Sequence, residues 1–252
     1  MQPETRPHNP CGVKVGCAGW SLPRDTWPEF PPDGSHLERY AARFNAVEIN
    51  SSFYRPHQPA TYARWAATVP AHFRFSVKLP KAITHEQRLR HCDALLDTFL
   101  AQVHSLGDKL GCLLVQLPPS LAFDPATATG FLTALRQRHA GGVALEPRHA
   151  SWFMAAAHDL LRAMKVARVL ADPVLFDTAA QPGGHHGLVY VRLHGSPKMY
   201  YSAYAPDVLD TLAVRLELAA ASDAGVWCIF DNTANGAAVP DALHLTGKLA
   251  RN

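Results

Sequence analysis

Residues 46–50, AVEIN, place two polar side chains in what otherwise reads as a buried strand. Side chains alternate between the two faces of a strand, so Glu48 and Asn50 share one face while Val47 and Ile49 share the other. The apolar face would pack against helices, and the polar face would then point into an enclosed interior. A carboxylate has no reason to lie there unless it is paired or used.

The chain alternates short apolar runs with longer helical patterns. Apolar residues recur at helical spacing over 91–106 and 207–222, and weaker helical patterns cover 36–44, 60–69, 126–138, 153–164 and 238–249. Strands are expected at eight ranges: 13–18, 46–50, 73–78, 111–116, 142–146, 167–171, 188–193 and 226–230. Strands that alternate with helices pair in parallel through right-handed crossovers. The pattern therefore predicts an α/β protein that forms a single (β/α)8 TIM-like barrel.

One domain is expected to occupy residues 13–252, after a flexible, polar and proline-rich N-terminal tail over residues 1–12. An open doubly wound sheet is the alternative architecture. Against it, no G-x-G-x-x-G follows the first strand and the third strand has no P-loop signature. The sequence thus contains no nucleotide-cofactor motif.

The composition is typical of a globular protein, with 48% hydrophobic and 18% charged residues. A net charge of +3, without a block of five like charges, argues against a nucleic-acid arm or a surface for anionic membranes. No apolar run is long enough to span a membrane. The five cysteines are irregularly spaced and form no C-x-x-C motif, which favours a reducing cytoplasm. We therefore expect a cytoplasmic protein without membrane association.

Every predicted strand changes from apolar to polar at its C-terminal end. The polar or aromatic residues at these ends are Trp20, Ser21, Glu48, Asn50, Ser76, Lys78, Gln116, Glu146, Arg148, Asp172, Arg192, His194, Asp231 and Asn232. Barrel enzymes place their active sites at this face. The formal charges of six of them sum to zero, so a purely structural ion-pair network is the alternative; the six are Glu48, Lys78, Glu146, Arg148, Asp172 and Arg192. Ion pairs scattered at random would not all lie at one end of the strands, which favours a functional site.

Seven short motifs run along the chain in a fixed order. They are VGCAGW at 15–20, VEINSSFYRP at 47–56, FSVKLPKAITH at 75–85, LLVQLPPS at 113–120, ALEPRHASWF at 144–153, YVRLHG at 190–195 and FDNTANGAA at 230–238. With them the chain resembles the domain-of-unknown-function 72 (YecE-like) family. The resemblance implies a TIM-like barrel and no particular reaction. The motif residues that it carries over are Trp20, Glu48, Asn50, Tyr54, Lys78, His85, Gln116, Glu146, Arg148, Trp152, Arg192, His194 and Asn232.

Four residues are candidates for catalysis: Glu48, Glu146, His194 and Lys78. The two glutamates would act as a general acid–base pair, with His194 as a proton carrier near neutral pH. Lys78 would form a Schiff base if its surroundings lower its pKa. A charged Lys78 paired with Glu48 is the simpler alternative, and it is the one that the sequence favours.

Arginine forks bind carboxylate or phosphate, and aromatic side chains beside them stack on rings. The expected substrate-binding residues are therefore Trp20, Asn50, Tyr54, Gln116, Arg148, Arg192, Tyr204 and Asn232. A divalent metal is a further hypothesis, since oxygen and imidazole ligands are offered by Glu48, Glu146, Asp172, His194 and Asp231. The nearby arginines and the lack of H-x-H or H-E-x-x-H spacing argue against a metal.

The leading hypothesis is an enzyme, a hydrolase, lyase or isomerase, that acts on a small anionic, phosphorylated or sugar-like substrate by acid–base chemistry. One alternative is a metal-dependent nucleic-acid-processing hydrolase, which the modest net charge disfavours. The other is a non-catalytic ligand-binding barrel. No feature of the sequence selects a substrate, a bond or an oligomeric state.

Overall fold

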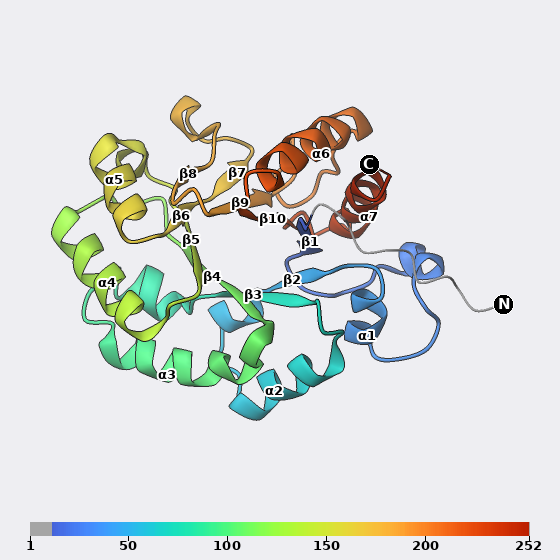
Figure 1. The fold of residues 1–252 in the computed structure, drawn as a ribbon, viewed down its shortest axis with the longest axis horizontal. Helices are drawn as coiled ribbons and strands as arrows, with labels where there is room; N and C mark the ends of the chain where they lie inside the picture. Colours follow the sequence, from blue (N-terminus) through green and yellow to red (C-terminus); the bar gives the residue numbers. More distant parts are fainter. Residues whose placement is uncertain (1–11, 252) are drawn as a thin grey trace.

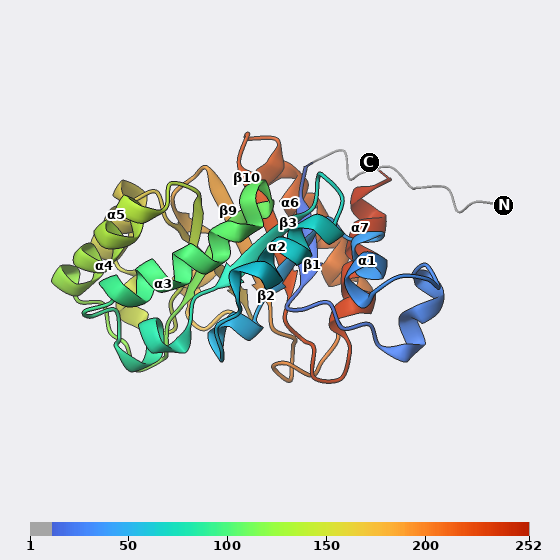
Figure 2. The ribbon, with the colours of Figure 1, turned by 90° about the horizontal axis from the view of Figure 1, so that it is seen from below.

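The structure is a computed structural model, and it describes residues 12–251. The tail expected over residues 1–12 lies outside this range except for Gly12. In Figures 1 and 2 the helices surround the strands, with α3 (Asp93–Val103), α4 (Pro125–Arg138) and α5 (Ala155–Ala163) at one end of the molecule. The helices α1 (His36–Ala41) and α7 (Ala238–Leu249) lie at the other end.

The described residues contain ten strands, and nine of them lie at the eight predicted ranges. The sixth range is divided by Val169 into β6 and β7, and the short strand β8 was not predicted. The bounds are β1 (Lys14–Cys17), β2 (Ala46–Ile49), β3 (Arg74–Lys78), β4 (Leu110–Gln116), β5 (Gly142–Glu146), β6 (Ala167–Arg168), β7 (Leu170–Asp172), β8 (Gly183–Gly184), β9 (Leu188–Leu193) and β10 (Gly225–Phe230).

All seven α-helices of the described chain lie at predicted ranges; the two not yet introduced are α2 (Pro59–Thr68) and α6 (Pro206–Ala220). Local sequence explains where they begin. Proline occupies the first turn of α2, α4 and α6, where its missing N–H costs nothing. At the start of α1, Ser35 and Glu38 form a reciprocal capping box. None of the helices formed by residues 12–251 is long and apolar enough to cross a membrane.

The hydrogen-bonded strands form two sheets instead of one uninterrupted ring. One sheet has the order β1-β10-β9-β7, and the other has the order β2-β3-β4-β5-β6-β8. An isolated parallel bridge between Ala18 and Glu48 links β1 to β2, and Val169 alone separates β6 from β7. The mixed α/β prediction is confirmed, whereas the hydrogen bonding does not show a single closed (β/α)8 barrel.

A glycine permits the close approach of β1 to β2. A Cβ atom on Gly16 would lie 2.0 Å from the carbonyl oxygen of Ala46, a distance that no side chain tolerates. The Tyr40 hydroxyl strengthens the same junction, because it donates to the Ala46 carbonyl at 2.9 Å and accepts from the Cys17 N–H at 2.7 Å. This junction holds Glu48 beside the end of β1.

The connection from β7 to β9 contains no α-helix. It contains a single 3-10 turn, Asp177–Ala179, followed by β8, which pairs antiparallel with β6. The stretch QPGGHHG at 181–187 therefore contributes a strand where its composition suggested only low complexity. A hollow of about 350 Å³ remains between α6 and the outer face of β7 and β9.

The two faces of the strands are used as the alternation predicts. Val47 and Ile49, expected to face the helices, are buried in the main apolar core, as are the residues that alternate with the polar ones on other strands: Val77, Leu145, Val191 and Leu193. A second, smaller apolar cluster fills the opposite face and comprises Ala46, Cys112, Leu114, Ala144, Ala167, Val169, Leu188, Tyr190, Trp227 and Ile229. The charged residues follow this inner cluster toward the C-terminal ends of the strands.

Candidate functional site

Arg192, on β9, is the centre of the charged residues at the strand ends. Its guanidinium donates to Glu48 through Nε at 3.0 Å and Nη2 at 2.7 Å, so this pair is bidentate. Nη1 donates to Glu146 at 2.6 Å, and Nη2 also donates to Asp231 at 3.1 Å. Arg192 is fully buried. Burial alone would lower the pKa of Arg192, but the Glu48, Glu146 and Asp231 carboxylates outweigh it, so the guanidinium stays charged.

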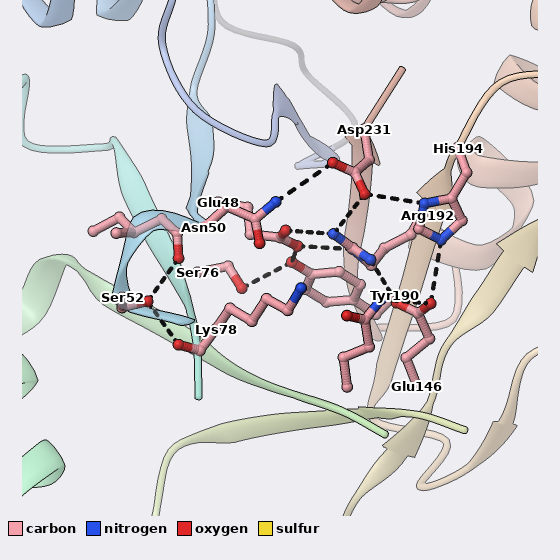
Figure 3. A network of polar contacts seen from close by, with 12 residues as sticks. Glu48, Asn50, Ser52, Ser76, Lys78, Glu146, Tyr190, Arg192, His194 and Asp231 are labelled. Carbon is pink, nitrogen blue, oxygen red and sulfur yellow. Dashed lines mark hydrogen bonds and ion pairs between the residues drawn. The ribbon is translucent and has the colours of Figure 1, made fainter. Parts of the chain in front are cut away.

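Glu48 is enclosed by its partners. Both of its oxygens bind Arg192, and the Tyr190 hydroxyl donates to Oε2 at 2.9 Å. That hydroxyl also lies 2.8 Å from Ser76 Oγ, which leaves Tyr190 bound from both sides (Figure 3). Since Glu48 is fully buried, its carboxylate holds Arg192 in place and is closed to a substrate. The pattern of strand ends did not select Tyr190, although it lies two residues before Arg192 on the same face of β9.

Glu146, at the end of β5, collects donors from three other residues besides Arg192. Its Oε1 accepts from Gln116 at 3.1 Å, from Arg148 Nη2 at 2.9 Å and from His194 Nε2 at 3.2 Å. Burial alone would raise the pKa of Glu146, but Arg192, His194 and Arg148 outweigh it and hold that pKa well below its ordinary value. Glu146 is therefore an anion, and its Oε1 accepts most of these hydrogen bonds while Oε2 binds Arg192.

His194 lies between two carboxylates. Its Nδ1 is 3.0 Å from Asp231 Oδ2, and its Nε2 faces Glu146. Burial alone would lower the pKa of His194, but Glu146 and Asp231 outweigh it and raise that pKa above its ordinary value. A carboxylate at each ring nitrogen therefore favours the protonated form of His194. For Asp231, burial is likewise outweighed by Arg192 and His194, and the pKa of Asp231 is lowered.

These five residues, Glu48, Glu146, Arg192, His194 and Asp231, are called the strand-end cluster below. A cavity of about 500 Å³ opens beside it, larger than the hollow behind β7 and β9. We call it the strand-end cavity. Its lining residues come from six strand ends and loops and are Asn50, Phe53, Tyr54, Lys78, His85, Gln116, Leu117, Pro119, Arg148, Tyr200, Asp231 and Thr233.

Lys78 is not paired with Glu48, so the simpler expectation for this residue is wrong. Glu48 is occupied by Arg192, and within residues 12–251 the Lys78 ammonium has no carboxylate or hydrogen-bond partner. It lies 4.2 Å from the centre of the Phe53 ring. Burial, reinforced by the charge of Arg192, lowers the pKa of Lys78 to about 8, against the opposing pull of the cluster carboxylates.

Five of the predicted substrate-binding or catalytic residues line this cavity, namely Asn50, Tyr54, Lys78, Gln116 and Arg148. Tyr54 lies at its rim with 74% of its surface exposed. Four other predicted residues do not line the cavity but form the hydrogen-bonded network behind it: Arg192, Glu48, Glu146 and His194. Lining residues that were not chosen as site residues include Thr233 and the aromatic pair of Phe53 and His85, whose ring centres are 4.9 Å apart. Loop residues such as Thr233 follow no strand alternation, so no pattern could place them.

Three other predicted residues lie away from the strand-end cavity. Trp20 packs edge-on against Trp65, with ring centres 5.0 Å apart. Asn232 donates to Asp241 at 2.7 Å and to the Ser202 carbonyl at 2.9 Å. It therefore supports the loop before α6 and does not reach the strand-end cavity.

The third, Tyr204, binds a residue that had been a candidate metal ligand. Its hydroxyl donates to Asp172 Oδ1 at 2.8 Å, and it accepts from the Gly195 N–H at 2.9 Å. Asp172 shares a face with Leu170, which belongs to the helix-facing core. The strand end was read correctly, but the side chain points to the other face.

The candidate metal ligands do not form a metal site. Within the described residues no group of three or more His, Cys, Asp or Glu side chains is arranged to hold a metal ion. The donor chemistry explains this, because Arg192 and His194 already bind the oxygens that a cation would need. Asp172 lies on the far face.

A comparison with protein families identifies the chain. The family described as "Protein of unknown function DUF72" matches residues 14–252, so the chain belongs to this family, as its motifs indicated. It is 34% identical over 144 residues to the UPF0759 protein YecE of Escherichia coli strain K12, covering 56% of this chain and 50% of YecE. It is 26% identical over 147 residues to the UPF0759 protein YunF of Bacillus subtilis strain 168, covering 56% and 52%. The matched segment thus spans about half the length of these curated relatives.

Solved structures resemble the whole fold at low sequence identity. A DUF72 family protein from Thermotoga maritima has a TM-score of 0.75 at 24% identity, covering 94% of this chain and 98% of that protein. One from Enterococcus faecalis has a TM-score of 0.76 at 20% identity, covering 94% and 95%. The catalytic domain of a mannanase from Streptomyces sp. SirexAA-E has a TM-score of 0.52 at 12% identity, covering 95% and 86%. These likenesses concern the fold alone.

Proposed function

We propose that this DUF72 member is an enzyme that binds a small anionic substrate in the strand-end cavity and acts on it by acid–base chemistry. One observation carries the proposal: Lys78 lines the cavity, and its ammonium group has no carboxylate partner among the described residues. A cation that is mostly buried and unpaired is costly, and a bound anion would relieve that cost.

The balance of charge supports an anion. The three carboxylates of the strand-end cluster, Glu48, Glu146 and Asp231, are matched by Arg192, by Arg148 and by His194 in the protonated form that its two carboxylate neighbours favour. Lys78 adds one positive charge that the cluster does not neutralise. Burial, followed by Lys78 and Arg148, lowers the pKa of His85, so this cavity residue is neutral near pH 7. The cavity therefore favours a ligand with at least one negative charge.

Arg148 is suited to hold that charge. Its Nε and Nη2 donate to Glu146, which fixes the plane of the guanidinium while 15% of the side chain stays exposed. A planar, oriented guanidinium is a good receptor for carboxylate or phosphate oxygens. Among the acidic residues, Asp231 lines the cavity, whereas Glu48 does not. We therefore assign acid–base work to Asp231 and Lys78, and assign the positioning of these groups to Glu48, Glu146 and His194.

The proposal includes a barrel. We infer that the two sheets act as one (β/α)8-type barrel with a charged mouth. Two contacts between the sheets support this: the Ala18–Glu48 bridge, and the N–H of Val169, just before β7, which donates to the Leu145 carbonyl of β5. Within its own sheet, β7 then pairs with β9. A barrel explains why residues from β2, β5, β9 and β10 meet at one point. It also agrees with the placement of catalytic groups at strand ends in barrel enzymes.

Calorimetric titration tests the anion site. Sulfate keeps its charge near neutral pH and is a suitable probe. We expect sulfate to bind the wild type, and Arg148→Met to weaken binding at least about tenfold, since a charge-assisted bidentate contact is lost. Lys81→Met is the matched control, because Lys81 is exposed and pairs with Glu86 at 3.1 Å. Equal sulfate affinity in the wild type and Arg148→Met would contradict the proposal.

The pH dependence of sulfate affinity gives a second check. Binding requires the charged form of Lys78, so affinity falls as the pH rises past about 8 in the wild type. Lys78→Arg should remove that decline, since arginine stays charged. If the protein is an enzyme, a screen of anionic compounds should find one that it turns over. Asp231→Asn should lose this turnover and still bind sulfate. Sulfate binding without any turnover would instead indicate a ligand-binding protein.

A further inference from the structure

The surroundings of Lys78 differ from those of three other lysines. Lys81 pairs with Glu86, Lys248 pairs with Asp210, and Lys109 donates to the Pro70 carbonyl. Lys78 has only 7% of its surface exposed, lines the strand-end cavity and contacts the face of Phe53 at 4.2 Å. No carboxylate among the described residues holds its proton.

This setting makes the neutral amine accessible. With the pKa of Lys78 at about 8, about a tenth of the side chain is unprotonated at pH 7, whereas an ordinary lysine is almost entirely charged. The Phe53 ring favours the charged form and opposes this trend, but a ring face offers no acceptor for the proton. An unprotonated lysine in a partly desolvated cavity is a nucleophile.

We propose that Lys78 forms an imine with a small aldehyde or keto acid whose carboxylate or phosphate group is held by Arg148. This inference rests on the proposed anion site and names its substrate class. Arg148 and Lys78 line the same cavity, so one ligand can present its anionic group to the first and its carbonyl carbon to the second. A cavity of about 500 Å³ suits a compound of this size.

The covalent step is balanced without a cofactor. The Lys78 Nζ lone pair attacks the carbonyl carbon, a C–N bond forms as the C=O π bond breaks, and one N–H proton moves to the oxygen to give a carbinolamine. The second N–H proton converts the hydroxyl group to water, the C–O bond breaks, and the nitrogen lone pair forms the C=N bond. The overall change is amine plus carbonyl to imine plus one water, with no oxidation or reduction.

Two neighbours are placed to assist. His85 lines the cavity and packs edge-on against the same Phe53 ring that Lys78 contacts, so it is available to move a proton between the nitrogen and the departing oxygen. The Oδ1 atom of Asn50 is buried and has no hydrogen-bond partner among the described residues. It is an acceptor for a ligand hydroxyl or a protonated nitrogen.

Borohydride trapping tests the imine. Full-length protein is incubated with glyoxylate, reduced with sodium borohydride, digested and mapped by mass spectrometry. We expect Lys78 to be labelled about tenfold or more faster than Lys81, and sulfate to suppress the label at Lys78 only. Acetaldehyde, which has no anionic group, should label Lys78 more slowly than glyoxylate, and Arg148→Met should abolish that preference.

Two variants separate the covalent step from anion binding. Lys78→Arg keeps the positive charge but cannot form an imine, so it should bind sulfate and give no adduct at position 78. Lys81→Arg should keep the adduct at Lys78. If sulfate binds the wild type but Lys78 stays unmodified while exposed lysines react, the imine is wrong and the anion site survives. If sulfate does not bind and does not change the rate at which Lys78 is labelled, both the anionic substrate class and the proposed function are contradicted.

Discussion

The inner face of the strands has two halves that are equally buried and held together in different ways. The half at the N-terminal ends is apolar, and there Tyr190 and Trp227 stack with ring centres 5.8 Å apart. The half at the C-terminal ends is the strand-end cluster, where Arg192 binds three carboxylates. The same alternation builds both halves, so the difference lies only in which residues the sequence places at each end.

The comparison shows two kinds of cohesion. In the apolar half, each side chain contributes its own buried surface, and losing one leaves a cavity. In the strand-end cluster, each charge is tolerable only because its partners are present. The cluster is therefore stable only with all of its partners in place, and Arg148, which binds Glu146, lines the strand-end cavity beside Lys78.

Removal of the Arg192 charge should have the largest effect on stability and should distinguish the two halves most clearly. Arg192→Met leaves the carboxylates of Glu48, Glu146 and Asp231 without their shared cation, and we expect a loss of about 3–5 kcal/mol in the free energy of unfolding at pH 7. The pKa of Glu146 is lower in the folded wild type than in the unfolded chain. The ionised Glu146 therefore stabilises the fold at pH values above its ordinary pKa, and this stabilisation is lost as the pH falls toward the lowered pKa. The deficit of Arg192→Met should thus shrink in acid. Denaturant titrations at several pH values measure it.

Trp227→Ala is the matched change in the apolar half. It should cost about 3–5 kcal/mol through the cavity that it leaves, with little change between neutral and acid pH. If the two variants showed the same pH profile, the distinction between the two halves would fail.

A smaller effect should follow from His194→Gln, which removes one of the cluster cations. We expect about 1–3 kcal/mol of destabilisation near pH 6, since Glu146 and Asp231 each lose a charged donor. The pKa of His194 is raised on folding, so its contribution is complete below its ordinary value of 6.5 and is lost as the pH rises through the folded value. The gap between the wild type and His194→Gln should therefore narrow toward alkaline pH. A gap that widened there would show that the folded histidine is neutral.

The smallest effect on stability is expected at the rim of the cavity. Tyr54 is 74% exposed, so Tyr54→Ala should change the free energy of unfolding by no more than about 0.5 kcal/mol. Its effect should appear in ligand affinity, because the ring lines the cavity. A large loss of stability would place Tyr54 with the cluster and not with the rim.

Much of the site could be predicted because strand periodicity is local. Glu48 was assigned to the inner face and Arg192 to a strand end, and the two side chains meet on the inner face. Asp172 was selected for its position at a strand end, but its side chain follows Leu170 to the outer face and meets Tyr204. Asn232 follows β10 and turns toward Asp241 instead of the cavity. Beyond the last ladder residue the backbone leaves the strand, so the period-two rule no longer applies.

The amino-acid sequence by itself determined the helices, every strand of the described residues except β8, the family and the polar character of the strand ends, because these depend on residue types and their spacing along the chain. Only the tertiary structure decided which charges are neutralised. The sequence places Glu48 at one position on its strand, but it offers several cations at neighbouring strand ends as partners. Glu48 pairs with Arg192 and not with Lys78 because of distances between segments that are far apart in sequence. Coulomb energy and burial are set by those distances, and they leave Lys78 as the unpaired amine of the cavity.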